Sequence, residues 1–363
     1  MKIGMFTDSY FPQINGVTYT ISLWKRKLLE RGHEVKVVFP SSENYEEGEN
    51  EFGVKSVSFP FYDGYRIGLP QKISDKIGEL DLIHTHSPFS VSFLGAYISR
   101  KRNIPRVSTH HTFPEDYIDY LVSKKMLKKS LIYLYRRWEK RFFNSAEVVT
   151  VPSKVIKEEM NKKGVRKIEV LENGVNRDFF KPSNPVFKEK FGNKLIGYSG
   201  RHSKEKNLSD IINVAKRFPE YTFLLGGNGP YRSNYKKMAS DLENVKLLGF
   251  LDREKLPSFY SSIDVFVFPS IAETQGLVAL EANACGTPVV GADKKALTET
   301  IVDGVNGYKY EPGDIDELEE KIEKVLESKG ELSQKSKDYI KNHSVKSSIK
   351  KLINIYERIT EGV

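Results

Sequence analysis

The sequence predicts an α/β protein with two doubly wound parallel sheets, each in its own domain. Along its 363 residues, short apolar segments of strand type alternate with amphipathic segments of helical spacing. A segment with two prolines at 181–185 interrupts this alternation and is expected to be a linker; the alternation restarts at Lys194. The length is sufficient for two domains of ordinary size. Parallel strands joined by helices place ligands beyond the carboxyl ends of the strands, so candidate site residues are sought there.

The first half opens with a βαβ unit. Residues 2–7 form a short apolar strand, residues 17–30 carry apolar side chains at helical spacing, and residues 35–40 form the next strand. The alternation then continues. Further strands are expected at 54–59, 81–86, 106–111, 147–152 and 167–171, and further helices at 72–80 and 89–101.

The second half repeats the pattern. Its strands are expected at 194–200, 221–225, 245–249, 265–268 and 289–290. The tail at 332–359 has helical spacing, and no strand follows it. We therefore expect a first domain at 1–185, a second at 186–345, and a C-terminal helix at 346–363 that packs back on the first domain.

Composition narrows the class of protein. The chain is 39% hydrophobic and 12% aromatic, which is typical of a globular protein. The single cysteine, Cys285, excludes an intramolecular disulfide framework and favours a reducing compartment. No window has the roughly 18 uninterrupted apolar residues of a membrane span, and the first residues carry too short an apolar run for a signal peptide. The net charge of +9 favours an anionic partner.

The stretch from Glu273 to Glu281 is the strongest candidate binding element. It follows the strand at 265–268 and begins a helix, whose free N–H groups would face an anion. Gly276 allows a ligand to approach the backbone there. If the segment is fully helical, Glu281 lies about 12 Å beyond Glu273, which matches the length of a nucleotide sugar with its diphosphate at the helix start. An ordinary amphipathic helix with two solvated glutamates is the alternative.

Two loops of the second half strengthen this interpretation. Arg201 and Lys206 follow the first strand, where a guanidinium fork and a mobile ammonium can bind phosphate oxygens. A solvated basic loop is the alternative, but the position at a strand end favours anion binding. The segment 226–230, Gly-Gly-Asn-Gly-Pro, either shapes a nucleotide pocket or only turns the chain.

The sequence predicts no metal and no cofactor. Asp314 and Asp316 are spaced like an Asp-x-Asp metal site, but they stand at a predicted helix start. N-capping and the helix dipole explain them better. No Cys or His pattern for zinc is present, and the Gly-x-Ser-x-Gly and Walker A motifs are also missing.

Polar residues also follow the strands of the first half. Asn15 and Gly16 lie in the loop after the first strand, where a phosphate would be expected, although Gly16 could simply make a turn. Four histidines stand at predicted strand ends, next to any ligand beyond the sheet. These are His84, His86, His110 and His111.

A basic, aromatic-rich helix is expected at 117–143. Such helices can lie in the headgroup region of an anionic membrane. We assign this role to the cluster Lys124, Lys125, Lys128 and Lys129. For residues 131–143 we expect the apolar face to pack on the domain's own sheet.

These features together resemble the family-four retaining glycosyltransferases of GT-B fold, in which two Rossmann-like domains face each other across a cleft. The resemblance covers essentially the whole chain. It rests on Asn15-Gly16-Val17, the loop from Gly200 to Lys206, the segment 227–230, and Glu273 with Glu281 in the stretch that continues to Val290. Within the family, residues 110–117 are similar to a segment of enzymes that glucosylate diacylglycerol. Those enzymes usually have Tyr-His-Thr, so His111 matches their sugar-binding histidine, His110 replaces the tyrosine, and Pro114 also departs from the commonest pattern.

The resemblance implies a role for each matching residue. Arg201 and Lys206 would hold the donor diphosphate and stabilise the leaving group, and Gly16 would let the first domain approach that phosphate. Glu273 would bind hydroxyl groups of the sugar. The N–H groups of Gly276 and Leu277 would bind phosphate, Glu281 would bind the ribose, and His111 would contact the sugar and help to stabilise an oxocarbenium-like state. Family members need no metal, and in a front-side reaction the leaving phosphate takes the acceptor proton.

We therefore expect a glycosyltransferase that moves a hexose from UDP-glucose to 1,2-diacylglycerol. It would act in the cytoplasm, as a peripheral protein on the inner face of the cell membrane. The nearest rival is a GDP-mannose-dependent enzyme that acts on a phosphatidylinositol-type lipid or a soluble glycan. Two further hypotheses are a catalytically silent nucleotide-sugar-binding protein and a nucleic-acid binder. The intact residue set argues against the silent protein, and the lack of any known binding motif argues against the nucleic-acid binder.

Overall fold

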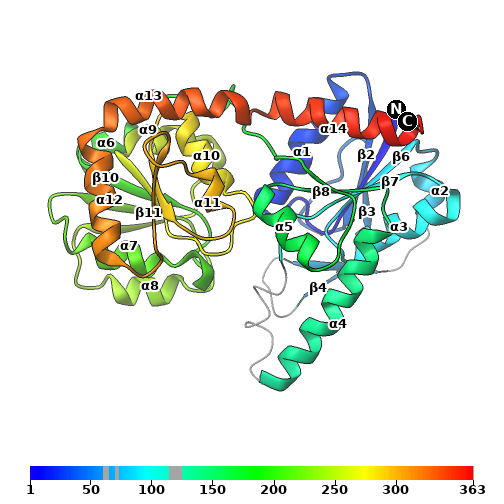
Figure 1. Ribbon diagram of the computed structural model, residues 1–363, viewed down its shortest axis with the longest axis horizontal. Coiled ribbons are helices and arrows are strands. Elements are labelled where there is room, and N and C mark those ends of the chain that lie inside the picture. Colours follow the sequence, from blue (N-terminus) through cyan, green and yellow to red (C-terminus); the bar gives the residue numbers. More distant parts are fainter. Residues whose placement is uncertain (60–64, 70–72, 114–124, 363) are drawn as a thin grey trace. The chain divides into compact units, whose positions relative to one another are not determined.

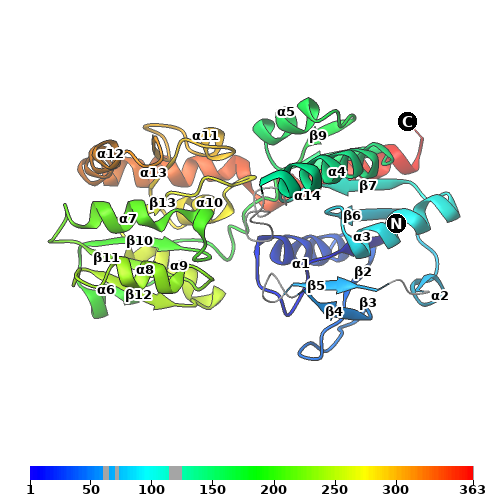
Figure 2. The same cartoon turned by 90° about the horizontal axis from the view of Figure 1, so that it is seen from below.

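A computed structural model describes residues 1–59, 65–69, 73–113 and 125–362, without the side chains of residues 74 and 125–128. It divides the chain into two units. The first comprises Met1–Glu172 and Ser348–Val363, and the second comprises Asn173–Ser347. In each unit a parallel sheet lies between layers of helices (Figure 1, Figure 2), so both units are doubly wound as expected.

In the described part of the first unit, seven parallel strands form one sheet in the order β3-β2-β1-β6-β7-β8-β9. The strands are β1 (Lys2–Thr7), β2 (Glu34–Pro40), β3 (Glu51–Val54), β6 (Leu82–His86), β7 (Arg106–Thr109), β8 (Val148–Val151) and β9 (Ile168–Val170). A small antiparallel pair joins β4 (Ser56–Ser58) to β5 (Arg66–Gly68). The helices are α1 (Gly16–Leu29), α2 (Ser74–Ile77), α3 (Ser90–Arg102), α4 (Lys125–Asn144) and α5 (Lys154–Lys162).

The second unit contains a six-stranded parallel sheet in the order β12-β11-β10-β13-β14-β15. The strands are β10 (Leu195–Ser199), β11 (Thr222–Gly226), β12 (Val245–Gly249), β13 (Val265–Phe268), β14 (Val289–Ala292) and β15 (Gly307–Tyr310). The α-helices are α6 (Val186–Phe191), α7 (Leu208–Ala215), α8 (Arg232–Met238), α9 (Leu256–Ser262), α10 (Leu277–Ala284), α11 (Leu297–Thr300), α12 (Ile315–Glu327) and α13 (Lys329–Tyr339). Short 3₁₀ turns lie at Lys204–Lys206, Arg253–Lys255 and Ile340–His343.

Burial explains why the central strands are continuous apolar runs. Every residue of β6, β10 and β13 is buried, because helices cover both faces of each sheet. The sequence did not predict strands β5 and β15. Strand β15 has two half-buried residues and reads Gly-Tyr-Lys-Tyr, so it carries no apolar run. The strand expected at 54–59 is instead divided between β3 and β4.

The division between the units falls after Glu172, earlier than the boundary expected at 185. Phe180 is only 1% exposed and belongs to the hydrophobic core of the second unit. The backbone N–H of Ser183 donates to Ser261 Oγ at 2.9 Å. The segment at 181–185 is therefore part of the second unit rather than a linker.

The last helix, α14 (Val345–Thr360), belongs to the first unit from Ser348 onward. It is the red helix that runs beside α1 in Figure 1. The hydroxyl of Tyr356 lies 2.6 Å from His84 Nδ1 on β6, and both residues are fully buried. This contact ties the end of the chain to the centre of the first sheet.

Candidate functional site

Each sheet has a point where the strand order reverses, and ligands of doubly wound folds bind at such points. In the first sheet the reversal lies between β1 and β6, and in the second between β10 and β13. Gly16 begins the helix that follows β1, and His84 and His86 lie within β6 near its carboxyl end. Arg201 and Lys206 follow β10, and Glu273 and Gly276 follow β13. The topology thus gathers the predicted residues of each unit at the expected edge of its own sheet.

Lys206 and Glu273 form an ion pair in the second unit, although they are 67 residues apart in sequence. Their side chains are only 18% and 14% exposed. The ammonium also lies 5.7 Å from the centre of the Phe268 ring. The backbone N–H of Ile271 donates to Glu205 O at 3.0 Å, which ties the two loops together. The structure therefore places a cation and a carboxylate side by side at the switch point.

The glycine loop at 226–230 supports the Arg201 loop through its backbone. Gly227 has a φ of +128°, and a Cβ there would lie 1.8 Å from the carbonyl oxygen of Gly200. The N–H of His202 donates to Asn228 O at 2.9 Å. Arg201 itself is partly buried, and its carbonyl accepts a hydrogen bond of 3.0 Å from the Tyr198 hydroxyl. These glycines therefore let the backbones of the two loops approach each other closely.

The helix expected after Glu273 is α10, and it begins at Leu277. Gly276 precedes it with a φ of +81°, a left-handed conformation that a residue with a Cβ would disfavour. A Cβ at this position would also lie 2.5 Å from Leu297 Cδ2. The N–H groups of the first turn have no acceptor within the helix. Gly276 and Leu277 therefore present backbone donors to the site, as an anion requires.

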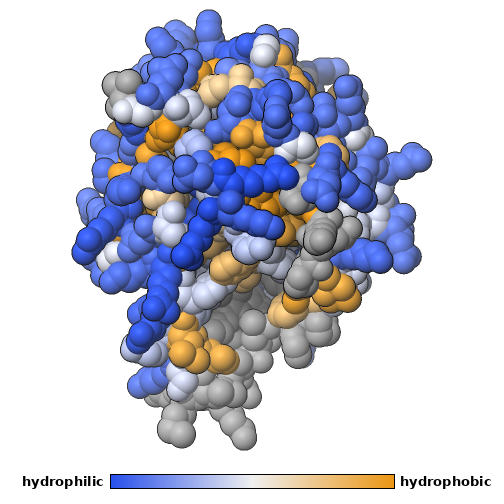
Figure 3. Space-filling view, turned by 90° about the vertical axis from the view of Figure 1, so that its right-hand side faces the viewer, coloured by the Kyte–Doolittle hydropathy of each residue, from blue (hydrophilic) through white to orange (hydrophobic). Residues whose placement is uncertain are grey.

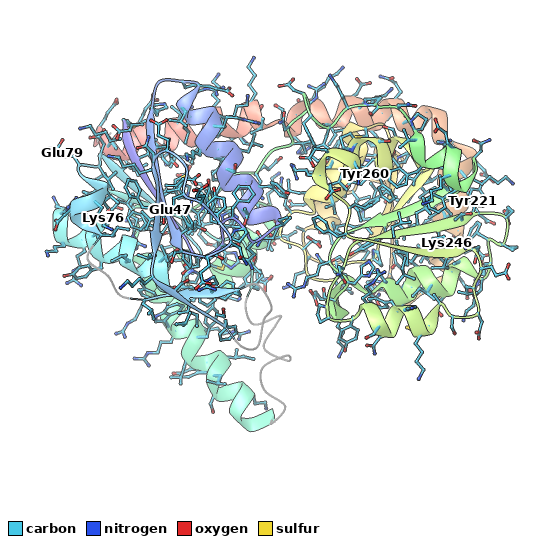
Figure 4. All side chains as sticks on the ribbon, turned by 180° about the vertical axis from the view of Figure 1, so that it is seen from behind. Glu47, Lys76, Glu79, Tyr221, Lys246 and Tyr260 are labelled. Atoms are coloured by element: carbon cyan, nitrogen blue, oxygen red, sulfur yellow. The ribbon has the colours of Figure 1, made fainter. Side chains whose placement is uncertain are left out.

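Glu281 lies inside α10 and is 7% exposed. Burial raises the pKa of its carboxyl to about 7, while Arg253 and Tyr260 oppose that shift. Both partners are distant: Arg253 Nη2 lies 3.5 Å from Oε1, and the hydroxyl of Tyr260 lies 3.5 Å from Oε2. Figure 4 labels Tyr260 in the second unit. Such loose contacts leave the carboxyl group able to take stronger hydrogen bonds from a ligand.

Arg253 is a residue that sequence reasoning missed. It follows β12 and stacks over the rings of Phe179 and Phe180, at 5.5 and 4.9 Å. Its only sequence signal is a position just after a strand end. The interpretation of Asp314 as an N-cap is confirmed, because its carboxylate accepts the N–H of Glu317 at 2.9 Å.

In the first unit, Gly16 is the first residue of α1 and is exposed. Asn15 caps this helix, and its Oδ1 accepts the N–H of Thr18 at 2.9 Å. Because α1 is the next element after β1, its N-terminus lies at the carboxyl end of β1, next to the switch point between β1 and β6, where an anion can bind.

The predicted histidine His111 follows β7 and is 5% exposed. Its Nε2 lies 3.0 Å from Nδ1 of His86, and the two ring centroids are 5.3 Å apart with 19° between the ring planes. Burial lowers the pKa of His111 to about 3 and that of His86 well below its usual value. Both rings are therefore neutral at physiological pH. His110 points elsewhere, since its Nε2 lies 3.6 Å from a buried carboxylate oxygen of Glu139.

The basic helix is observed as α4, of 20 residues. Of the predicted membrane cluster, Lys124 lies outside the described residues, Lys125 and Lys128 have undescribed side chains, and Lys129 is exposed. The expectation that the apolar face of 131–143 packs on the sheet holds for its end, where Phe142 and Phe143 are buried.

The same expectation is wrong for Tyr133 and Leu134, which are 63% and 61% exposed. A helix of this length spans about 30 Å, and it extends past the edge of the sheet (Figure 1), so only its C-terminal end can reach the core. Figure 3 shows one face of the first unit, with apolar patches in orange among hydrophilic side chains in blue.

Among the described residues, no group of three or more His, Cys, Asp or Glu side chains is arranged to hold a metal ion. The described helices also include none that is long and apolar enough to cross a membrane.

Comparison with known proteins first defines the class. The structure matches the sucrose-phosphate synthase of Thermosynechococcus elongatus with a TM-score of 0.81 and 18% identity, over 100% of both chains. The fold is thus that of the GT-B glycosyltransferases.

Sequence comparison then gives the family. The family model for glycosyltransferase family 4 matches residues 14–179, and that for glycosyl transferases group 1 matches residues 180–343. An alpha-monoglucosyldiacylglycerol synthase of Streptococcus pneumoniae is 30% identical over 85% of this chain and 75% of its own. A GDP-mannose-dependent alpha-mannosyltransferase of Corynebacterium glutamicum is 26% identical over 87% of this chain and 78% of its own. The chain belongs to glycosyltransferase family 4, and it is a glycosyltransferase enzyme.

Proposed function

We propose that this enzyme is a retaining glycosyltransferase that moves glucose from UDP-glucose to a membrane lipid, 1,2-diacylglycerol. The observation that supports binding of a nucleotide-sugar donor is the Lys206–Glu273 ion pair, which joins the loops after β10 and β13 next to the N-terminus of α10. A nucleotide sugar needs this combination, because its diphosphate requires cationic and N–H donors while its sugar requires a hydroxyl acceptor.

Different residues bind the different parts of the donor. Arg201, Lys206 and the first N–H groups of α10 bind the diphosphate, and Glu273 accepts hydrogen bonds from sugar hydroxyls. Glu281, farther along α10, accepts hydrogen bonds from the ribose. The buried position of its carboxyl makes such bonds stronger than they would be in water.

The chemistry requires stabilisation of a leaving group. As the bond between the sugar and the phosphate breaks, negative charge grows on the diphosphate, and preformed cationic donors lower the energy of that state. From the family resemblance we assign Gly16 and His111 of the first unit to phosphate binding and sugar binding, respectively. The leaving phosphate accepts the proton of the acceptor hydroxyl, so no protein nucleophile is needed and no metal takes part. Activity should accordingly survive treatment with a metal chelator.

The lipid acceptor is supported by the surface of the first unit. Exposed Tyr133 and Leu134 lie on α4 among the exposed cations Lys129, Arg136 and Arg137. Apolar side chains flanked by Lys and Arg favour the interface of an anionic bilayer. The name of the relative from Streptococcus pneumoniae points to the same acceptor. We therefore place the enzyme on the cytoplasmic face of the cell membrane as a peripheral protein.

A GDP-mannose-dependent mannosyltransferase, acting on a phosphatidylinositol-type lipid or a soluble glycan, is the second candidate. It is favoured by the name of the Corynebacterium relative, which aligns over a similar share of this chain.

The decisive experiment incubates the purified protein with radiolabelled UDP-glucose or GDP-mannose and anionic vesicles that contain diacylglycerol or phosphatidylinositol. We expect radiolabelled diacylglycerol when UDP-glucose is the donor, and no labelled lipid when GDP-mannose is the donor. Transfer from GDP-mannose alone would favour the second candidate. Transfer to a soluble sugar but to no lipid would refute the lipid acceptor, and binding of both nucleotides without turnover would indicate a silent protein.

A further inference from the structure

A column of buried aromatic rings stands behind His111 in the first unit. The rings of His84 and His86, at the end of β6, have centroids 4.1 Å apart, and the centroids of His86 and His111 are 5.3 Å apart in nearly parallel planes. Trp24 of α1 stacks on His84 at 5.9 Å. His84 and His86 are fully buried, so their ring nitrogens depend on protein partners.

Hydrogen bonds hold the His84 ring of this column in place. His84 Nδ1 lies 2.6 Å from the Tyr356 hydroxyl, and its Nε2 lies 2.6 Å from Thr109 Oγ1. Thr109 Oγ1 in turn lies 2.6 Å from Thr150 Oγ1 on β8. Both nitrogens of His84 are therefore engaged, and its ring is held between α14 and the sheet.

His86 has only one of its two nitrogens engaged. Its Nδ1 lies 3.0 Å from His111 Nε2, whereas its Nε2 is buried with no hydrogen-bond partner among the described residues. Two arrangements of the proton are conceivable. If His111 donated, His86 would carry its own proton on the unpaired Nε2, as a buried N–H without an acceptor, which is the rarer kind of orphaned group. If His86 Nδ1–H donates, only an unpaired acceptor is buried.

We propose that His86 is a positioning residue for the transfer reaction: its Nδ1–H donates to His111 Nε2, fixes the orientation of that ring and keeps the His111 proton on Nδ1. The inference rests on the proposed function only in that His111 contacts the sugar. The ordered column behind His86 supplies the rigidity, because His84 and Trp24 limit the tilt of its ring. A displacement of a reacting group by about 1 Å can cost on the order of 10²-fold in rate.

Variants of His86 separate positioning from packing. His86→Leu keeps an apolar side chain of similar size but removes the donor, whereas His86→Asn places an amide N–H near the position of Nδ1. We expect His86→Leu to lower kcat about 10²-fold, with the KM for UDP-glucose changed by less than about threefold. His86→Asn should recover most of that loss.

Thr150→Val is the matched control for lost stability. It breaks the contact with Thr109 in the same polar chain but does not touch His111. It should lower the melting temperature and leave kcat near that of the wild type. A His86→Leu protein with kcat within about threefold of the wild type would overturn the inference. So would a His86→Asn protein no more active than the leucine variant.

The tautomer can be measured directly. The chain has seven histidines, so ¹⁵N NMR of histidine-labelled protein can resolve each ring, with His111→Gln to assign the signal. We expect the His111 proton on Nδ1 in the wild type, and a shift toward Nε2 in His86→Leu. A proton on Nε2 in the wild type would refute the inference. This result does not depend on turnover, whereas a wild-type protein that fails to transfer glucose contradicts only the proposed function.

Discussion

Lys206→Ala tests the donor site most directly, because two effects of this change can be separated. In the folded protein the change leaves Glu273, with a side chain only 14% exposed, without its cation. Breaking a fully buried ion pair costs about 3–5 kcal/mol. Since this pair is partly open to solvent, we expect the free energy of unfolding to fall by about 1–3 kcal/mol.

The catalytic effect of Lys206→Ala should be larger. Removal of one preformed donor from a developing negative charge typically costs about 10²–10³ in kcat. We therefore expect kcat to fall by about that factor, measured by release of UDP under saturating donor and acceptor. Lys324→Ala, which removes an exposed lysine paired with Glu320, should leave both the free energy of unfolding and kcat close to their wild-type values.

A double variant distinguishes the two effects. Lys206→Ala with Glu273→Gln removes the unpaired charge, so it should regain most of the lost melting temperature without regaining kcat. If Lys206→Ala keeps kcat within about threefold of the wild type, Lys206 does not stabilise the leaving group. If the double variant regains activity together with stability, the loss was structural.

Three further predictions concern the buried Glu281, the close contact at Gly227, and the exposed side chains of Tyr133 and Leu134. Burial raises the pKa of Glu281 to about 7, so the contribution of this carboxyl group to stability is lost as pH rises from about 4.5 toward 7. Hydrogen bonds from ribose hydroxyls should lower that pKa. Calorimetry near pH 7 should therefore detect proton release when the donor binds to the wild type, and none when it binds to Glu281→Gln. Gly227→Ala, whose Cβ would meet the Gly200 carbonyl, should cost more than about 2 kcal/mol in thermal unfolding, and a cost below about 0.5 kcal/mol would contradict the contact. Replacing both Tyr133 and Leu134 by Ser should weaken sedimentation with anionic vesicles about tenfold, and unchanged binding would place the membrane contact elsewhere.

The sequence by itself determined the fold class and the strand ends after which the candidate donor-binding residues lie. Parallel strands covered on both faces must be apolar throughout, so β1, β10 and β13 are visible as continuous runs. Once the strands are known, the loops at their carboxyl ends are known too, which is why Arg201 and Glu273 could be predicted without coordinates.

Other features depended on contacts between distant parts of the chain. Strand β15 lacks an apolar run and exists because it pairs with β14. The exposure of Leu134 depends on where the sheet ends beneath α4, which the helical periodicity of the segment does not encode.

The buried histidines show most clearly what the sequence could predict and what only the tertiary structure could reveal. The sequence placed His86 and His111 at strand ends, but periodicity specifies only which face of a strand a side chain occupies, and not its partner. The pairing of β6 with β7 brings His86 opposite Thr109, two residues before His111. The contact of His84 with Tyr356 joins residues 272 positions apart. Hydrogen bonds between such distant residues form only once the sheet and α14 have assembled, so only the tertiary structure could show which group holds His111 in place.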